Sequence, residues 1–175
     1  MSLSRLLTAV KEWPLFPIDD RGLFHVLASL VISQRIRFRK GQSIRSSIYA
    51  LQGRSDLNEI GNLTDEQRTE VGLDDQKWAI IQRLIDKKEE EGDLSNIKGV
   101  GPWTLGCASI MAGDYSCGFV HGDLAVRKEI TKLLGLETMI KPKELVALVE
   151  PLDKEAGAKL FSRIWYRTGP YKHKK

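Results

Sequence analysis

Two glycines between two short helical patterns, with a lone acid after them, constrain the fold more than any other part of the chain. Residues 94–97 read as a helical turn, residues 98–101 (Lys-Gly-Val-Gly) interrupt it, and Pro102 stands where a helix favours its first residue. Glycine tolerates a left-handed backbone and carries no side chain, so the amides that open the second helix can approach an anion closely. The sequence therefore predicts two short helices joined by a hairpin that can bind a phosphate, such as that of DNA.

The acid that follows the hairpin is Asp123, which stands before a helical pattern over residues 124–130. An Asp at this position caps free amides and interacts favourably with the helix dipole, so a structural role is the commoner interpretation on spacing alone. A carboxylate at the mouth of a helix is also a candidate for acid–base or electrostatic catalysis. Both interpretations stay open at this point.

The size and composition of the chain set broad limits. A length of 175 residues suffices for one compact unit or two small lobes that share a cleft. Two cysteines, Cys107 and Cys117, require no disulfide or metal crosslink and suit a reducing compartment. No apolar run approaches the length of a membrane span, and residues 1–10 lack the layout of a signal peptide. We therefore expect a cytoplasmic (nucleoid) or nuclear protein that is not secreted and has no membrane partner.

The positive charge is concentrated in one block. The net charge of +4 is mild, but residues 33–54 contain six basic side chains and no acid. These are Arg35, Arg37, Arg39, Lys40, Arg45 and Arg54. Such a block attracts polyanions and gives salt-dependent binding, although a run of charges is often only a solvated helix face.

Short, well-punctuated helical patterns account for most of the chain. They cover residues 3–13, 19–33, 38–51, 55–60, 64–72, 74–91, 123–136, 142–150 and 154–168, and a further helix begins at Pro102. Asp19 and Asp20 are placed to cap the second pattern, and Thr64 with Gln67 forms a capping box. No run alternates between apolar and polar residues as a strand does. The predicted fold class is all-α.

The hairpin sequence L-x-x-I-x-G-V-G, Trp103 and Asp123 together resemble the helix-hairpin-helix DNA glycosylase superfamily of base-excision repair enzymes. The segments IKGVGPWT and GDLAVRK are most similar to its 3-methyladenine (alkylation-repair) branch, and weaker similarity extends over residues 20–168. The resemblance implies a two-lobed helical fold with the active site in the cleft between the lobes. The central lobe would span residues 20–113 with the hairpin, and both termini, residues 1–19 and 114–175, would form the second lobe.

The same resemblance implies a catalytic role for Asp123. Breaking an N-glycosidic bond builds positive charge on the sugar, which a nearby carboxylate can stabilise while it orients or deprotonates water. Bifunctional relatives, which also cut the strand, carry a Lys where this chain has Trp103. The resemblance therefore implies a monofunctional hydrolase that flips out an alkylated purine, with 3-methyladenine favoured, from double-stranded DNA.

Other site residues follow from the resemblance position by position. The base pocket would contain Trp103, Trp165 and Cys107; DNA contacts would come from Gln34, Arg35, Arg37, Lys98, Gly99, Val100, Gly101 and Arg127. Arg35 falls on the wedge position of an S-Q-x-I segment, where a phosphate contact is an equal alternative, and Gln34 either contacts the opposite base or holds the turn. A monovalent cation, Na⁺ or K⁺, would bind main-chain oxygens of Ser95, Ile97 and Val100. Catalysis would need no cofactor, and two cysteines are too few for the iron–sulfur cluster of another branch.

Three other functions compete with this hypothesis. A glycosylase/lyase acting on oxidised bases needs a catalytic Lys, whereas Lys98 and Lys128 are expected to face phosphate or solvent. A non-catalytic damage-binding module would use the hairpin and the basic block equally well, and only the role of Asp123 separates it from an enzyme. A helical protein-interaction domain predicts no affinity for DNA. The resemblance also implies that the protein acts as a monomer.

Overall fold

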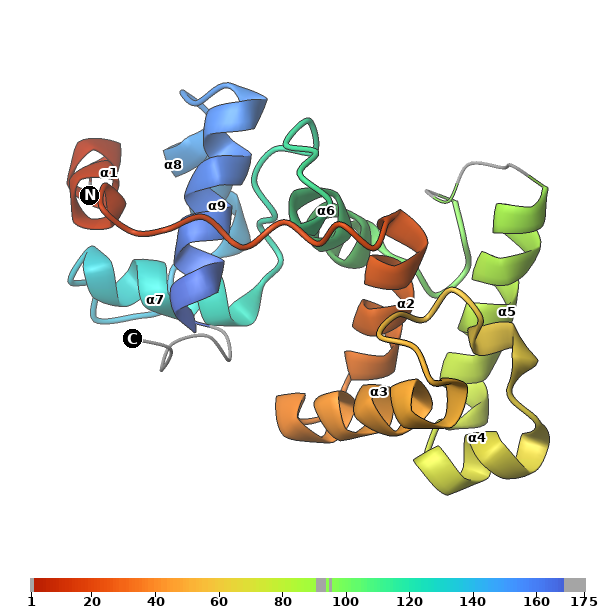
Figure 1. The fold of residues 1–175 in the computed structure, drawn as a ribbon. Helices are drawn as coiled ribbons and strands as arrows, with labels where there is room; N and C mark the ends of the chain where they lie inside the picture. Colours follow the sequence, from red (N-terminus) through yellow and green to blue (C-terminus); the bar gives the residue numbers. More distant parts are fainter. Residues whose placement is uncertain (1, 91–93, 95, 169–175) are drawn as a thin grey trace. The chain divides into compact units, whose positions relative to one another are not determined.

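The computed structural model describes residues 2–90, 94 and 96–168, and Figure 1 shows its helices in chain order. The helices are α1 (Leu3–Val10), α2 (Leu23–Ser33), α3 (Phe38–Gln52), α4 (Asp65–Val71), α5 (Asp75–Glu89), α6 (Pro102–Met111), α7 (Leu124–Leu133), α8 (Pro142–Val149) and α9 (Lys154–Thr168). A 3₁₀ turn, η1 (Ile60–Asn62), precedes α4. No strand occurs in the described part of the chain, and the all-α prediction is confirmed.

The chain divides into two compact units. The central unit spans Asp19–Ala108, and the terminal unit combines Met1–Ile18 with Ser109–Lys175. The resemblance implied boundaries at 19/20 and 113/114, whereas the second observed boundary falls inside helix α6. Among the described residues, no helix is both long enough and apolar enough to cross a membrane.

Helix α2 forms the centre of the central unit. Its sequence is apolar on nearly every side, which is typical of a helix buried all round, and it packs against α3 and α5. Its buried apolar side chains are Phe24, Val26, Leu27, Ala28, Val31 and Ile32. Figure 1 shows α2 beside both partner helices. The helix ends at Ser33, where the chain leaves the core toward the basic block.

Several helix ends follow the predicted capping chemistry, and the start of α2 does not. Thr64 and Gln67 form the expected capping box, and Gly53 and Gly72 end their helices in the left-handed conformation. Asp19 and Asp20 do not cap α2, because the cap position is taken by Gly22, with φ 91° and no side-chain hydrogen bond.

The helix predicted over residues 55–60 is also wrong. The carboxylate of Asp56 accepts a hydrogen bond from the amide of Asn58 (2.8 Å), an arrangement that turns the chain instead of continuing a helix. Only the short 3₁₀ turn η1 forms after it.

The terminal unit packs α1 and α7 against α9. Leu6 and Val10 of α1, Val126 and Ile130 of α7 and Phe161 of α9 are among its fully buried side chains. The segment before the central unit is attached to α9 as well. The amide of Phe16 donates to Oγ of Ser162 (2.6 Å), and the hydrogen bond is buried. Ser162, a buried polar residue of α9, therefore holds the segment around Phe16 against this helix.

His25 is a buried histidine of α2, 1% exposed, whose role the sequence did not predict. Its Nδ1 accepts a hydrogen bond from the amide of Leu57 (3.0 Å), and its Nε2 lies 3.3 Å from Oγ of Ser29. Burial, together with the charge of Arg21, lowers the pKa of His25 from 6.5 to about 4. A proton on Nδ1 would also face the N–H of Leu57, so the neutral ring is the one that fits.

Because of His25, we expect the folded protein to lose stability in acid. The substitution His25→Asn should reduce that loss. Because the pKa is lower in the folded chain, the unfolded chain binds the proton first. Stability is then fully present above pH 6.5 and falls as the pH drops toward 4, by at most about 3 kcal/mol. The oxygen of an Asn can accept the bond from Leu57 and does not titrate, so the slope between pH 6.5 and 4 should flatten.

Urea unfolding at several pH values measures that slope directly. His121, whose pKa burial also lowers, supplies a residual dependence of the same sign. An unchanged slope in His25→Asn would show that His25 is not the titrating group. A lower stability at pH 7 alone would not bear on the prediction, because Asn is smaller than His and leaves space in the core.

Candidate functional site

The two hairpin glycines have different structural roles. Gly99 has φ +101°, and a Cβ built on it would lie 2.5 and 2.6 Å from Cγ1 and Cδ1 of Ile80. Gly101 has no positive φ, and a Cβ built there would meet nothing within 4 Å. Packing within the chain therefore explains Gly99 alone. The exposed backbone at Gly101 opens helix α6 and leaves room for a ligand to approach the amides there.

Two buried apolar side chains attach the hairpin to the core. Ile97 and Val100 are each 6% exposed, and the amide of Val100 donates to the carbonyl oxygen of Ile97 (2.9 Å). Lys98 is exposed, while its carbonyl accepts a hydrogen bond from Nη1 of Arg83 (3.3 Å). The alternation of buried Ile97 and Val100 with exposed Lys98 and Gly101 places the polar backbone of the turn at the surface.

Gln34, the cap residue at the end of α2, connects that helix to the hairpin. Its Nε2 donates to the carbonyl oxygen of Gly99 (3.3 Å) and to Oγ1 of Thr104 (3.2 Å). Thr104 is 3% exposed, and its role was not predicted from the sequence. These two bonds are what the turn-holding alternative expects of Gln34, and its contact with the opposite base stays a prediction. The only sequence signal for Thr104 was a polar residue within the otherwise apolar stretch that follows Pro102.

Arg35 follows in a strained conformation. It is the one non-glycine residue with a positive φ (56°) in the part of the chain that the structure describes, and it is exposed. A left-handed backbone costs a side-chain-bearing residue roughly 1–2 kcal/mol, and such strain concentrates at functional sites. The turn held by Gln34 therefore presents an arginine at the surface at an energetic cost, which favours a binding role for this residue.

The predicted basic block separates into exposed and internally bonded arginines. Arg35, Arg37 and Arg39 are exposed around the first turn of α3, where no acid and no side-chain cap occur. Arg45 instead donates to Oγ of Ser33 (2.6 Å), and Arg54 pairs with Asp56. The first group is available to a polyanion; the second group contributes to the fold.

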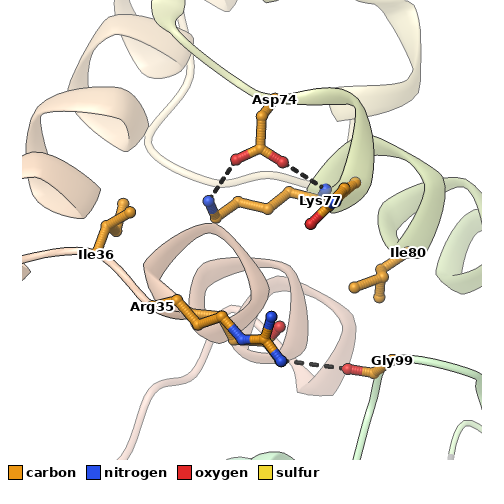
Figure 2. A pocket seen from close by; sticks show the side chains of 8 residues that line it. Arg35, Ile36, Asp74, Lys77, Ile80 and Gly99 are labelled. Carbon is orange, nitrogen blue, oxygen red and sulfur yellow. Dashed lines mark hydrogen bonds and ion pairs between the residues drawn. The ribbon is translucent and has the colours of Figure 1, made fainter.

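A pocket of about 350 Å³ lies next to the hairpin within the central unit. Figure 2 shows its lining, which includes Arg35, Ile36, Asp74, Lys77 and Ile80. Asp74 caps α5 by accepting from the amide of Lys77 (2.9 Å), and its other carboxylate oxygen binds Nζ of the same residue. Burial alone would raise the pKa of Asp74, but the hydrogen bonds from Lys77 hold it below its usual value.

Asp123 is the N-cap residue of α7 in the terminal unit. Its side chain is 6% exposed, and its Oδ1 accepts a hydrogen bond from the amide of Val126 (2.8 Å). Gly122, just before it, is exposed, and a Cβ built there would meet nothing within 4 Å. The capping role weighed from the sequence is therefore present. It fixes one carboxylate oxygen rigidly at the end of an open, glycine-containing loop.

Aromatic side chains stand beside the Asp123 loop. The ring of Phe119 lies 5.6 Å from that of His121 and 5.5 Å from that of Phe161. Trp165 stacks on Phe16 at 4.6 Å with an interplanar angle of 23°, and it lies 5.5 Å from Phe161. The structure thus shows Trp165 in a core aromatic cluster and half-buried, so one ring face is already covered by Phe16.

The remaining predicted residues lie as follows. Trp103 is half-buried in the first turn of α6, and Cys107 one turn later is fully buried in the core. Nε and Nη2 of Arg127 donate to the carbonyl oxygen of Ile140 at 3.0 and 2.8 Å. Arg127 therefore stabilises the loop between α7 and α8, and its contact with DNA stays a prediction.

Two of the three predicted cation ligands lie on the hairpin, and Ser95 falls outside the described residues. The carbonyl of Ile97 already accepts the amide of Val100, which leaves one lone pair for an ion. Neutral carbonyl oxygens are hard ligands and suit an alkali ion rather than a transition metal. No cluster of His, Cys, Asp or Glu that could hold a metal occurs among the residues described.

No protein family model matches the chain, and no curated protein has significant sequence similarity to it. Solved structures do resemble it. A DNA-3-methyladenine glycosidase from Bacillus halodurans has a TM-score of 0.72 at 18% identity, over 97% of this chain and 86% of that chain. The 3-methyladenine DNA glycosylase of Schizosaccharomyces pombe, in complex with abasic DNA, has a TM-score of 0.72 at 16% identity, over 95% and 91% of the two chains. The chain shares their helical fold.

Proposed function

We propose that the chain is a monofunctional DNA glycosylase that flips an alkylated purine, with 3-methyladenine favoured, out of double-stranded DNA and hydrolyses its N-glycosidic bond. The observation that carries the proposal is the buried carboxylate of Asp123, held by the amide of Val126 beside an open glycine. The shared fold of two 3-methyladenine glycosylases supports it.

Hydrolysis of the N-glycosidic bond of an alkylated purine requires one correctly positioned carboxylate from the protein. As the base leaves, positive charge develops on the sugar, and a carboxylate below the ring stabilises it. The same group can orient or deprotonate the attacking water. An alkylated purine is already cationic and departs without much protonation, so a single acid suffices. The cap bond from the amide of Val126 positions one carboxylate oxygen of Asp123 before the substrate arrives, which is the preorganisation that electrostatic catalysis needs.

The central unit offers the means of holding DNA. The exposed backbone at Gly101 supplies amides for one phosphate, and exposed Arg35, Arg37 and Arg39 supply charge for others. A monovalent cation on the carbonyls of Ile97 and Val100 would add a bridge from the hairpin to phosphate. Flipping a base costs a few kcal/mol, and weakly paired damaged bases cost least, so the DNA contributes part of the selectivity.

The residue at the start of α6 separates the proposal from lyase chemistry. Trp103 occupies the position where a Schiff-base lysine would stand, and its ring can stack on a cationic base. Lys98 and Lys128 are exposed. Borohydride treatment on abasic DNA should therefore trap no covalent adduct. A trapped adduct would assign the chain to the glycosylase/lyases instead.

The direct test is chromatography of the free bases released from DNA treated with a methylating agent. We expect release of methylated purines, with 3-methyladenine leading. Release of another base would keep the reaction and correct the substrate. No release, despite salt-sensitive binding to the same DNA, would contradict the proposed reaction and favour a non-catalytic damage-binding module.

A further inference from the structure

We propose that Arg45 is a positioning residue, which holds the end of helix α2 so that the next turn presents the strained Arg35 to DNA. The inference rests on the proposed function, because it takes the exposed arginines as contacts to DNA. Arg45 belongs to the basic block of the sequence, yet it is half-buried and its guanidinium is bonded within the central unit. It can therefore affect DNA binding without contacting DNA.

The guanidinium of Arg45, in the middle of α3, completes a set of hydrogen bonds at the last turn of α2. Its Nη1 donates to Oγ of Ser33 (2.6 Å) and to the carbonyl oxygen of Ser29 (3.4 Å). Oγ of Ser33 donates in turn to the same carbonyl oxygen (2.9 Å). A charged donor makes a stronger hydrogen bond than a neutral one, so Arg45 attaches the last turn of α2 firmly to α3.

The two helices approach each other closely at Gly41. A Cβ built on Gly41 would lie 2.8 Å from Oγ of Ser33 and 3.3 Å from its Cα. Figure 1 shows α3 crossing the end of α2. The backbone of Ser33 therefore lies directly against α3, and its hydroxyl cannot turn away without losing the hydrogen bond from Arg45.

The turn that follows α2 is held by the hairpin as well. Gln34 donates to the carbonyl oxygen of Gly99, and Arg35 comes next with its positive φ of 56°. A strained backbone persists only where its surroundings over-determine it, and Arg45 and Gln34 supply two such restraints on either side of one peptide unit. Without Arg45 the turn should relax, and Arg35 should spend less time in the conformation that binds DNA.

The test measures affinity for a duplex with an uncleavable abasic-site analogue, as a function of salt concentration. Arg45→Met should weaken binding about tenfold and leave the slope of log K against log salt unchanged, because no phosphate contact is lost. Arg37→Met, at an exposed position, should lower that slope by about 0.9. Ser33→Ala removes the acceptor and keeps every charge. It should also weaken binding, and it serves the same comparisons if Arg45→Met does not fold.

Arg54→Met is the matched control for the loss of one positive charge. Arg54 belongs to the same basic block, but it follows the end of α3 at Gly53 and pairs with Asp56. Its replacement should leave the affinity as it is. Urea unfolding of each variant separates a loss of stability from a loss of binding.

A double variant tests whether Arg45 acts through Arg35. Arg35→Gly removes the side chain and also the strain, since glycine accepts a left-handed backbone. It should weaken binding by itself, because a contact to DNA is lost. In this background Arg45→Met should weaken binding by a further factor of roughly two at most, whereas two independent effects would multiply.

Three results would overturn the inference. The first is a loss of affinity in Arg45→Met and Ser33→Ala that is no larger than in Arg54→Met, which would leave only an effect of net charge. The second is a shallower salt dependence in Arg45→Met, which would make Arg45 a phosphate contact. The third is the same loss in Arg45→Met with and without Arg35→Gly. Release of methylated bases by a chain that gives any of these results would refute the positioning role and retain the proposed function.

Discussion

Replacement of Asp123 by Asn should slow release of methylated bases about 10²–10⁴-fold under single-turnover conditions. The amide oxygen of Asn can still accept the hydrogen bond from Val126, and Asn is as good a cap as Asp, so the folded structure should persist. What is lost is the negative charge that stabilises the sugar cation and activates water. Affinity for undamaged duplex should change little, because the exposed cations that attract DNA are untouched.

Two further variants separate catalysis from capping. Asp123→Ala removes both the charge and the cap, and it should add a loss of about 1 kcal/mol in the free energy of unfolding. Asp153 accepts a hydrogen bond from the amide of Ala156 (2.7 Å) at the start of α9, which is the same geometry at an exposed position. Asp153→Asn should therefore leave the rate of base release unchanged. Equal rates in wild type and Asp123→Asn would remove Asp123 from the chemistry.

The second large effect concerns the two hairpin glycines. Their substitution by Ala should affect different properties: Gly99→Ala the stability of the fold, and Gly101→Ala the binding of DNA. Gly99→Ala adds a left-handed residue with a side chain, roughly 1–2 kcal/mol, and a clash with Ile80, roughly 1–3 kcal/mol. Urea unfolding should therefore show a loss of about 2–5 kcal/mol. Gly101→Ala has neither penalty and should unfold as the wild type does, within about 1 kcal/mol.

For DNA binding we expect the larger effect from Gly101→Ala, the variant that should keep its stability. A methyl group on Gly101 occupies the open space over the backbone where a phosphate would approach, so Gly101→Ala should weaken duplex binding about tenfold, or about 1.4 kcal/mol. The measurement is affinity as a function of salt concentration, in which the slope should also fall. Normal binding by a folded Gly101→Ala variant would show that the hairpin does not hold a phosphate at this position.

The clash at Gly99 can be checked independently. Ile80→Ala removes the atoms that a new Cβ would meet, so the double variant should lose less stability than the sum of the losses of the two single variants. The part that remains is the backbone strain of the left-handed conformation. Additive effects would mean that Ile80 does not determine the requirement for glycine.

The sequence alone determined those features that depend on local chemistry. The helical periodicity, the capping box at Thr64 and the glycines that end α3 and α4 were all readable, because each involves residues within one or two turns. The glycine turn at residues 98–101, the helix that begins at Pro102 and the acid at the start of α7 were readable for the same reason. The helical turn predicted over residues 94–97 is not found, because residues 94, 96 and 97, the ones described there, form no helix. Local patterns misled twice more: Asp19 and Asp20 looked like caps for α2, and residues 55–60 looked like a helix.

Tertiary contacts decided the roles of particular side chains. Asp19 is bonded to Arg21 near the buried His25, Gln34 reaches Gly99 and Thr104, and Arg45 is tied to Ser33. The residue type alone does not predict these hydrogen-bond partners. A Gln or an Arg in a sequence can equally well contact solvent, DNA or a carbonyl oxygen. The difference between Gly99 and Gly101 is of this kind as well.

The sequence by itself therefore determined that the chain is helical, where its hairpin lies and which carboxylate is a candidate for chemistry. Only the tertiary structure decided that Gly99 is required by Ile80 while Gly101 faces open space, and that Arg35 is strained and exposed. The physical reason is the separation along the chain over which each kind of interaction acts. Backbone hydrogen bonds and caps join neighbours along the chain, whereas packing, burial and the pairing of charges join residues that the sequence keeps far apart.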